Sequence, residues 1–228
     1  MGGMEQSRKR RGNFRGAFFV IGAVAKSAIW YNYVVSGECV VCAAPRHRNG
    51  GTVDSKIEKY VKAIPDFPKP GVLFRDVTGI LDSGEGFRLA MVEMESALAG
   101  AQVDKVAAPE SRGFIFGAAL ADRLRCAFVP IRKPGKLPRR TISEEYELEY
   151  GRATLHMHDD AISPGDRVVV IDDLLATGGT AVAAARLVER LGGKVVKIMF
   201  PIELEGFGAR QGKLAGYDVF SLVRYPGK

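Results

Sequence analysis

The segment VVVIDDLLATGGTA, residues 168–181, constrains the fold of this chain more than any other part of its sequence. Residues 168–171 are β-branched and apolar on both faces, which is typical of a buried strand in a parallel sheet. After Thr180, small and aliphatic residues recur at helical spacing up to Leu191, and the glycines at 192–193 favour a helix end. The segment therefore predicts a strand, a loop and a helix, with other elements covering both faces of the strand.

Two acids and a Gly-rich loop follow this strand, and together they indicate a ligand. Backbone N–H groups of such a loop at a helix start attract phosphate, and ligands of open α/β sheets lie at the carboxyl ends of the strands. A carboxylate about 4 Å from a phosphate is repelled by roughly 4 kcal/mol at an effective dielectric near 20, so Asp172 and Asp173 cannot both face it. A ribose 5-phosphate suits both the loop and the acids: its phosphate would lie in the loop, and its hydroxyls or a bound cation would lie at the acids. The alternative to a ligand site is an ordinary strand followed by a turn. A Walker-type nucleotide site is disfavoured because no Gly-Lys-Ser/Thr follows the loop.

The segment resembles the phosphoribosyl pyrophosphate motif of type I phosphoribosyltransferases. Four further stretches narrow this resemblance to the adenine phosphoribosyltransferase family: PDFPKPGVLFRDVT at 65–78, ESRGFIFG at 110–117, PIRKPGKLP at 130–138 and YELEYGRATL at 146–155. The resemblance covers about residues 55–227, with the motifs in the family's order. It implies transfer of the 5-phosphoribosyl group from phosphoribosyl pyrophosphate to adenine, which gives AMP and pyrophosphate in purine salvage.

The resemblance also implies how the sugar donor is held. Asp172 and Asp173 hold the ribose hydroxyls, and the 5-phosphate lies in the loop of Ala176, Thr177, Gly178, Gly179 and Thr180. Basic residues must meet the pyrophosphate, since each charge-assisted hydrogen bond is worth roughly 1.5–3 kcal/mol. The expected pyrophosphate residues are Glu110, Ser111, Arg112, Arg132, Lys133 and Lys136, of which Arg112 and Lys136 are also catalytic candidates. A solvated basic loop is the alternative for the last three of these.

For the base, the resemblance implies that Phe74 stacks on adenine opposite Leu174, while backbone groups of Leu73 and Arg75 read its Watson–Crick edge. From spacing alone, Phe74 would be called a core residue. Residues 137–151 resemble a hood that closes over the reactants and excludes water. Within this stretch Glu149 is the main catalytic candidate, facing N7 of adenine with Tyr150 alongside. A merely solvated acidic face is the alternative.

The sequence departs from the family at Ala108-Pro109, where a glycine and a non-proline residue are usual. Proline removes an N–H and fixes φ. Relatives adopt a strained cis peptide beside the acid of this loop, so the departure puts the geometry of the pyrophosphate loop in question.

The remaining pattern predicts an α/β fold: a doubly wound, mostly parallel sheet flanked by helices, with a small hood and an antiparallel ribbon. Alternating polar and apolar residues at 143–158, with a bend near Gly151, predict the ribbon. His156 and His158 share one face of it and are expected to be exposed rather than to bind metal. Helices are expected at 55–63, 86–99, 113–124 and 206–214, and strands at 72–74, 103–108, 127–132, 194–202 and 217–223.

Charge separates two regions, an N-terminal extension at 1–53 and a phosphoribosyltransferase domain at 54–228. The net charge is +7, and the extension alone holds eight Lys/Arg against two acids, so the domain is nearly neutral. The extension reads as poorly ordered, as a targeting segment, or as translated sequence without a role. Its apolar run at 17–25 is too short to span a membrane. Cys39, Cys42 and His47 offer only three zinc ligands where structural zinc needs four.

The expected cofactor is Mg²⁺, held mainly through substrate with no firm protein ligand, because magnesium keeps several waters. The expected partners are adenine, phosphoribosyl pyrophosphate and a second copy of the chain in a homodimer, without nucleic acid or membrane. We expect a cytoplasmic location, with organelle targeting through residues 1–53 as the alternative. Two other functions stay open: a phosphoribosyltransferase for another base, and a non-catalytic regulator that senses phosphoribosyl pyrophosphate.

Overall fold

The computed structural model describes residues 34–35, 38–39, 56–148 and 151–227. The chain divides into two compact units, Met1–His47 and Arg48–Lys228. In the first unit, β1 (Val34–Val35) pairs antiparallel with β2 (Glu38–Cys39). Cys42, His47 and most of the expected extension lie outside the described residues.

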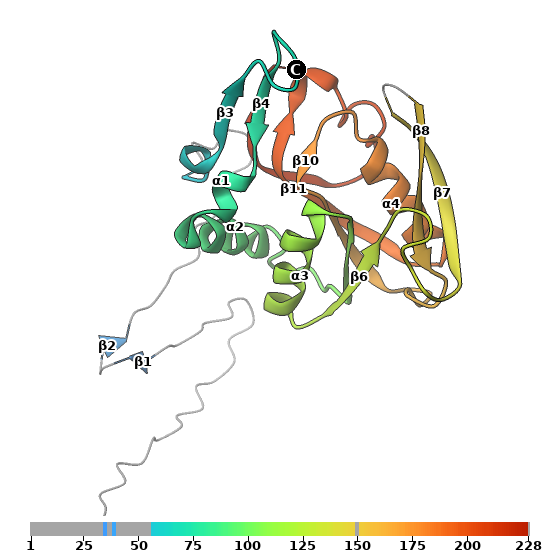
Figure 1. The fold of residues 1–228 in the computed structure, drawn as a ribbon. Helices are drawn as coiled ribbons and strands as arrows, with labels where there is room; N and C mark the ends of the chain where they lie inside the picture. The colour runs from blue at the N-terminus through green and yellow to red at the C-terminus, as the bar shows by residue number, and fades with distance from the viewer. Residues whose placement is uncertain (1–33, 36–37, 40–55, 149–150, 228) are drawn as a thin grey trace, which may run out of the picture. The chain divides into compact units, whose positions relative to one another are not determined.

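A parallel sheet forms the centre of the second unit (Figure 1). Its strands lie in the order β6, β5, β9, β11, β12, and β10 continues along β11 where β9 ends. Every recorded pairing between them is parallel, so their carboxyl ends lie at one edge. The strands are β5 (Lys105–Pro109), β6 (Ala127–Ile131), β9 (Arg167–Ile171), β10 (Leu174–Leu175), β11 (Lys194–Leu204) and β12 (Val219–Tyr225).

Helices cover both faces of this sheet, as the double winding predicts (Figure 1). Val169 and Ile171 of β9 pack in one core with α2 (Gly84–Ser96) and α3 (Arg112–Leu124). Val168 and Val170 face the other way, into a core with α4 (Gly179–Arg190). Residues 168–171 are all 0 % exposed, so the strand is buried on both sides, as its composition indicates.

Two antiparallel pairs complete the unit. The first joins β3 (Lys62–Pro65) to β4 (Leu73–Asp76), and the short helix α1 (Thr78–Leu81) follows it. The second is the ribbon of β7 (Thr141–Leu148) and β8 (Gly151–His158), which confirms the antiparallel ribbon expected at 143–158. The fold expected from the sequence, with its parallel sheet, flanking helices and ribbon, is therefore the fold observed.

Three local expectations are wrong. The helix expected at 55–63 is only a 3-10 turn, η1 (Glu58–Tyr60), because residues 62–65 satisfy their backbone groups by pairing with β4. The helix expected at 206–214 is likewise one 3-10 turn, η2 (Glu205–Phe207), which ends at Gly208 with φ of 63°. His158 is buried rather than exposed, with its Nδ1 3.3 Å from the carbonyl oxygen of Arg140.

Candidate active site

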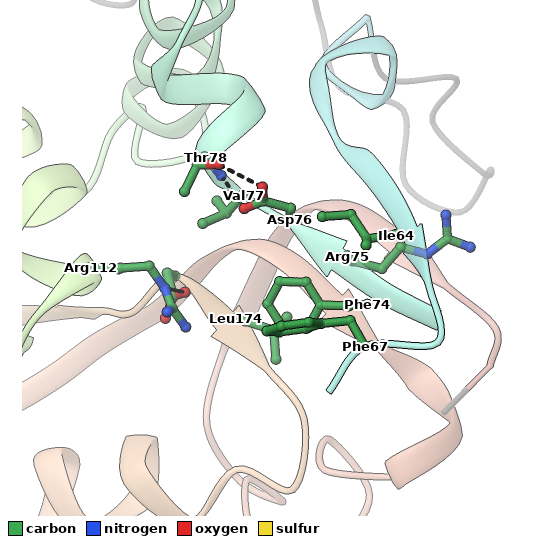
Figure 2. A pocket seen from close by; sticks show the side chains of 10 residues that line it. Ile64, Phe67, Phe74, Arg75, Asp76, Val77, Thr78, Arg112 and Leu174 are labelled. Atoms are coloured by element: carbon green, nitrogen blue, oxygen red, sulfur yellow. Dashed lines mark hydrogen bonds and ion pairs between the residues drawn. The ribbon is translucent and has the colours of Figure 1, made fainter. Parts of the chain in front are cut away.

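A cavity of about 290 Å³ opens where β9 ends and β10 begins, beside β4 and the start of α3 (Figure 2). Parallel strands present their following residues at this edge, and the site therefore combines segments distant in sequence. The residues that line it are Ile64, Phe67, Phe74, Arg75, Asp76, Val77, Thr78, Arg112, Asp173 and Leu174. Five of these were predicted site residues: Phe74, Arg75, Arg112, Asp173 and Leu174.

The two adjacent acids differ in environment. The Asp173 carboxylate lines the cavity and pairs with the Nε of Arg112, although the residue is only 8 % exposed. The Asp172 Oδ1 accepts a hydrogen bond from the backbone N–H of Asp173 at 2.9 Å. Burial and the neighbouring Asp173 charge raise the pKa of Asp172 well above its ordinary range. At the end of β9, one carboxyl is thus paired with Arg112 and the other is strongly desolvated.

A glycine at the start of α3 lets the helix approach these acids. A Cβ at Gly113 would lie 3.0 Å from Asp172 Oδ1 and 3.2 Å from the carbonyl oxygen of Ile171. Real Cβ contacts are rarely this short, so the carboxylate would have to move. Gly113 therefore allows Arg112 and Asp172 to belong to one compact site.

The predicted pyrophosphate loop is organised around Glu110. Its Oε2 accepts hydrogen bonds from Arg132 Nε at 3.0 Å and Nη2 at 2.8 Å, and its Oε1 accepts the backbone N–H of Lys133 at 2.7 Å. Burial raises the pKa of Glu110, but the hydrogen bonds from Lys133 and Arg132 outweigh it, and the net pKa is lowered. The peptide between Glu110 and Ser111 is cis. The carboxylate therefore holds Arg132 and the loop that follows in a fixed relation to α3.

The structure also accommodates the unusual Pro109. The N–H of Glu110 donates to the carbonyl oxygen of Ile131 in β6. Because successive residues of a strand point their backbone groups to opposite neighbouring strands, the nitrogen of Pro109 faces β9. The recorded pairs between β5 and β9 end at Ala107, before that position. Proline therefore removes no donor that the sheet uses there.

An apolar wall forms the other side of the cavity. Phe74 and Phe67 make an edge-to-face contact with ring centroids 5.1 Å apart, next to Leu174 (Figure 2). Arg75 points away from these rings in Figure 2, and its guanidinium lies over the Tyr225 ring at 3.8 Å from the centroid. Leu73 is 43 % exposed and is not among the lining side chains. Aromatic and aliphatic faces on one wall can hold a flat, weakly polar ring.

Several lining residues were missed by the sequence reading. Ile64 belongs to β3 and Phe67 to the turn after it, both beyond the helix expected at 55–63. Asp76 accepts hydrogen bonds from the Thr78 N–H at 2.9 Å and the Thr78 hydroxyl at 2.6 Å. Burial raises the pKa of Asp76, yet these bonds outweigh it and leave the pKa lowered. A signal was present, because Phe67, Asp76 and Thr78 lie within the quoted segment 65–78.

The predicted phosphate loop lies between β10 and the start of α4. Gly178 has φ of 77° and precedes the first helical residue, Gly179, so the loop turns sharply into the helix. A second hollow, of about 240 Å³, is lined by Gly179 together with residues of β7, α4 and Lys213. A Cβ at Gly179 would lie 3.0 Å from the carbonyl oxygen of Glu147, so the ribbon lies close over the helix start. The flanking residues Ala176, Thr177 and Thr180 are half-buried.

Other predicted residues lie apart from the cavity or outside the described range. The side chains of Lys133 and Lys136 are exposed and line neither hollow, and the Lys136 carbonyl accepts a hydrogen bond from Arg132 at 3.2 Å. Ser111 is exposed at the start of α3. Glu149 and Tyr150, which come between β7 and β8 in the sequence, lie outside the described residues.

Comparison with known proteins gives a consistent result. The family model of the phosphoribosyl transferase domain matches residues 85–219. Adenine phosphoribosyltransferase of Lachnoclostridium phytofermentans is 53% identical over 173 residues, which are 76% of this chain and 99% of that protein. The crystal structure of adenine phosphoribosyltransferase from Thermoanaerobacter pseudethanolicus has 52% sequence identity and a TM-score of 0.71, over 74% of this chain and 98% of that one.

A further structure, that of the Saccharomyces cerevisiae adenine phosphoribosyltransferase complexed with an imino-altritol bisphosphate and adenine, is 36% identical with a TM-score of 0.68, over 73% of this chain and 96% of that one. Among the residues that the structure describes, no helix has the length and apolar character needed to cross a bilayer. The domain match spans more than half of the sequence and the first relative is matched along nearly its full length, so the chain belongs to the adenine phosphoribosyltransferase family.

Proposed function

We propose that this chain transfers the 5-phosphoribosyl group from phosphoribosyl pyrophosphate to adenine, forming AMP and pyrophosphate. The observation that carries the proposal is the composition of the cavity: the apolar wall of Phe74 and Leu174 faces the same space as Arg112 and Asp173. A base and the sugar to which it becomes attached must share one site, and these residues supply complementary surfaces for each. The relatives named above, one of them solved with adenine, support the same substrate.

The charges of the site suit the reaction. Breaking the bond from the anomeric carbon to pyrophosphate builds positive charge on the sugar and negative charge on the leaving group, so catalysis depends on positioning and electrostatics. Asp172 and Asp173 hold the ribose hydroxyls and lie near the developing positive charge. Arg112 uses its Nε for Asp173, which leaves both Nη groups available for the pyrophosphate. Arg132, held by Glu110, supplies a further positive charge.

Mg²⁺ is the proposed cofactor, and its chemistry would be to neutralise the pyrophosphate oxygens. The described residues contain no group of three or more His, Cys, Asp or Glu side chains that could hold a metal ion. We propose that the ion arrives on the donor, because magnesium keeps several of its waters and takes few protein ligands. The protein's own part is to receive that complex with the acids 172–173.

Glu149 and Tyr150 would act from the ribbon that carries them. Glu144 of β7 pairs with Arg186 at 3.4 Å and Arg190 at 3.1 Å on α4, which fixes the ribbon beside the phosphate loop. Glu149, within the quoted motif YELEYGRATL at 146–155, would manage the proton at N7 of adenine while N9 attacks. Closure of the hood expected at 137–151 would exclude water that otherwise hydrolyses the donor.

We further infer a homodimer and a cytoplasmic location. The dimer follows from the family resemblance, in which basic residues of the pyrophosphate site come partly from a partner subunit, and Lys133 and Lys136 are exposed as such an arrangement requires. The location follows from the donor, which is an intracellular metabolite. Targeting through residues 1–53 is the alternative.

A steady-state assay with each purine and pyrimidine base tests the proposal. The purified protein is incubated with phosphoribosyl pyrophosphate, Mg²⁺ and one base at a time, and the nucleotide product is quantified by chromatography. Turnover with adenine alone is expected. Turnover with another base would transfer the function to that base, and tight donor binding without any turnover would indicate a sensing regulator.

A further inference from the structure

The phosphate loop of this chain contains no positively charged side chain. Its residues 176–180 are Ala, Thr, Gly, Gly and Thr, which offer backbone N–H groups and hydroxyls only. Arg112 and Arg132 are paired with Asp173 and Glu110, and the proposed function assigns their remaining N–H groups to the pyrophosphate instead of the 5-phosphate. A phosphate monoester carries close to two negative charges at neutral pH. The 5-phosphate therefore needs a counter-charge from another part of the fold.

The connection between β11 and β12 lies directly against this loop (Figure 1). A Cβ at Gly178 would lie 3.3 Å from both Ala209 Cβ and Leu214 Cγ, and these two side chains are 6 % and 1 % exposed. A Cβ at Gly179 would lie 3.6 Å from the Nζ of Lys213. The same connection thus forms an apolar wall behind one glycine and places an ammonium group over the next.

A salt bridge between Arg210 and the buried Glu203 holds this connection on the sheet. Arg210 donates from Nε to Glu203 Oε1 at 2.7 Å, from Nη2 to Oε2 at 2.6 Å, and from Nη1 to the carbonyl oxygen of Val219 at 2.6 Å. Ser221 donates to the same carboxylate at 2.7 Å. Because Glu203 is only 3 % exposed, these bonds are shielded from water and fix the backbone three residues before Lys213.

The charges around Lys213 leave its ammonium group available. It forms no ion pair with any carboxylate of the described residues, whereas Arg186 in the same hollow is paired with Glu144. Two acids, Glu145 and Glu147, also line the hollow, and Glu145 is paired with Arg152 at 3.5 Å. Lys213 is therefore the unpaired cation of the hollow that adjoins the phosphate loop, within the part of the chain described.

We propose that Lys213 binds the 5-phosphate of the donor and of AMP, from the side of the loop opposite to the ribose. This assignment rests on the proposed function, since it names a further binding residue for the same nucleotide. Lys213 would add a charge-assisted hydrogen bond to those from the loop, and it would recognise the phosphate rather than the base or the ribose.

The binding of AMP and of adenosine to the Lys213→Met variant tests whether Lys213 recognises the 5-phosphate specifically. The two ligands differ only in the 5-phosphate, and both affinities are measured by calorimetry on the full chain. We expect AMP to bind about tenfold more weakly than to the wild type, the low end of what a charge-assisted hydrogen bond supplies, with adenosine affinity unchanged. Lys213→Arg should retain most of the AMP affinity, because it keeps the charge.

Lys194→Met is the matched control. Lys194 is an exposed lysine at the opposite end of β11, remote from the loop, and its replacement should change neither affinity. If Lys213→Met binds AMP as tightly as the wild type while the wild type converts adenine to AMP, the inference is overturned and the proposed function stands. If the wild type forms no AMP from adenine, the proposed function fails, and this inference fails with it.

Discussion

Replacing Gly113 by alanine should damage donor binding without unfolding the protein. The added Cβ would lie 3.0 Å from Asp172 Oδ1, 3.2 Å from the carbonyl oxygen of Ile171 and 3.4 Å from Asp172 Cα. The softest of these neighbours is the carboxylate, which must move by a few tenths of an ångström. That movement lengthens the hydrogen bond that Asp172 Oδ1 accepts from the Asp173 N–H, now 2.9 Å.

The size of the effect follows from what the carboxylate does. Loss of one hydrogen bond to a charged group is worth roughly 1.5–3 kcal/mol, so the KM for phosphoribosyl pyrophosphate should rise by about tenfold or more. In the helix, alanine is favoured over glycine by roughly 0.5–1 kcal/mol, which offsets part of the crowding. The melting temperature should consequently change by only about 2–4 °C.

Gly117→Ala provides the comparison, because its Cβ would meet core atoms instead of the site. It would lie 2.8 Å from Phe128 Cε2 and 2.9 Å from Ala108 Cβ. Overpacking of this kind costs about 1–3 kcal/mol, so this variant should melt earlier but keep the donor KM when assayed well below its melting temperature. Steady-state kinetics and thermal denaturation of both variants test the reasoning. An unchanged donor KM in Gly113→Ala would refute the role given to the position of Asp172.

Three further outcomes are expected. Phe74→Ala should raise the KM for adenine by about tenfold or more with the donor KM nearly constant, since base–aromatic stacking is worth about 1–3 kcal/mol; equal loss for both substrates would contradict a stacking role. Glu149→Gln should lower kcat by at least about tenfold, at the low end of general acid–base help, and unchanged kinetics would remove Glu149 from the mechanism. Burial raises the pKa of Asp172 above its ordinary value of 3.8, so the folded chain loses stability as pH rises from that value through the raised pKa. Asp172→Asn should thus be more stable at neutral pH, by on the order of 1 kcal/mol, while binding donor poorly; a lower melting temperature for this variant would oppose the assignment.

The parts of the fold that were predictable are those where local pattern and burial agree. Residues 168–171 are apolar on both faces because helices cover both faces of β9, and the helical spacing after Thr180 matches α4. Residues 62–65 were misread because their strand character arises only from pairing with β4, about ten residues away. At 206–214, glycines and the bond from Arg210 to Glu203 replace the helix that spacing suggested.

The site residues likewise divide into those that local sequence predicts and those that depend on the fold. Asp172, Asp173 and the loop after them are contiguous, so the sequence reveals them together. Phe67 and Asp76 enter the cavity through the β3–β4 pair, whose position against β10 no local pattern records. No local pattern singles out Lys213, because the contact of its connection with Gly178 and Gly179 depends on how the chain returns from β11 to β12.

We expect one pocket to bind the sugar donor through the paired acids Asp172 and Asp173. Calorimetric titration of the full chain with Mg²⁺–phosphoribosyl pyrophosphate, compared with the Asp172→Ala/Asp173→Ala variant, tests it most directly, with circular dichroism to establish that the variant is folded. We predict saturable binding to the wild type and a loss of at least about tenfold in the variant, because two hydrogen-bonding carboxylates are removed. Equal donor affinity for the two folded proteins would contradict the account.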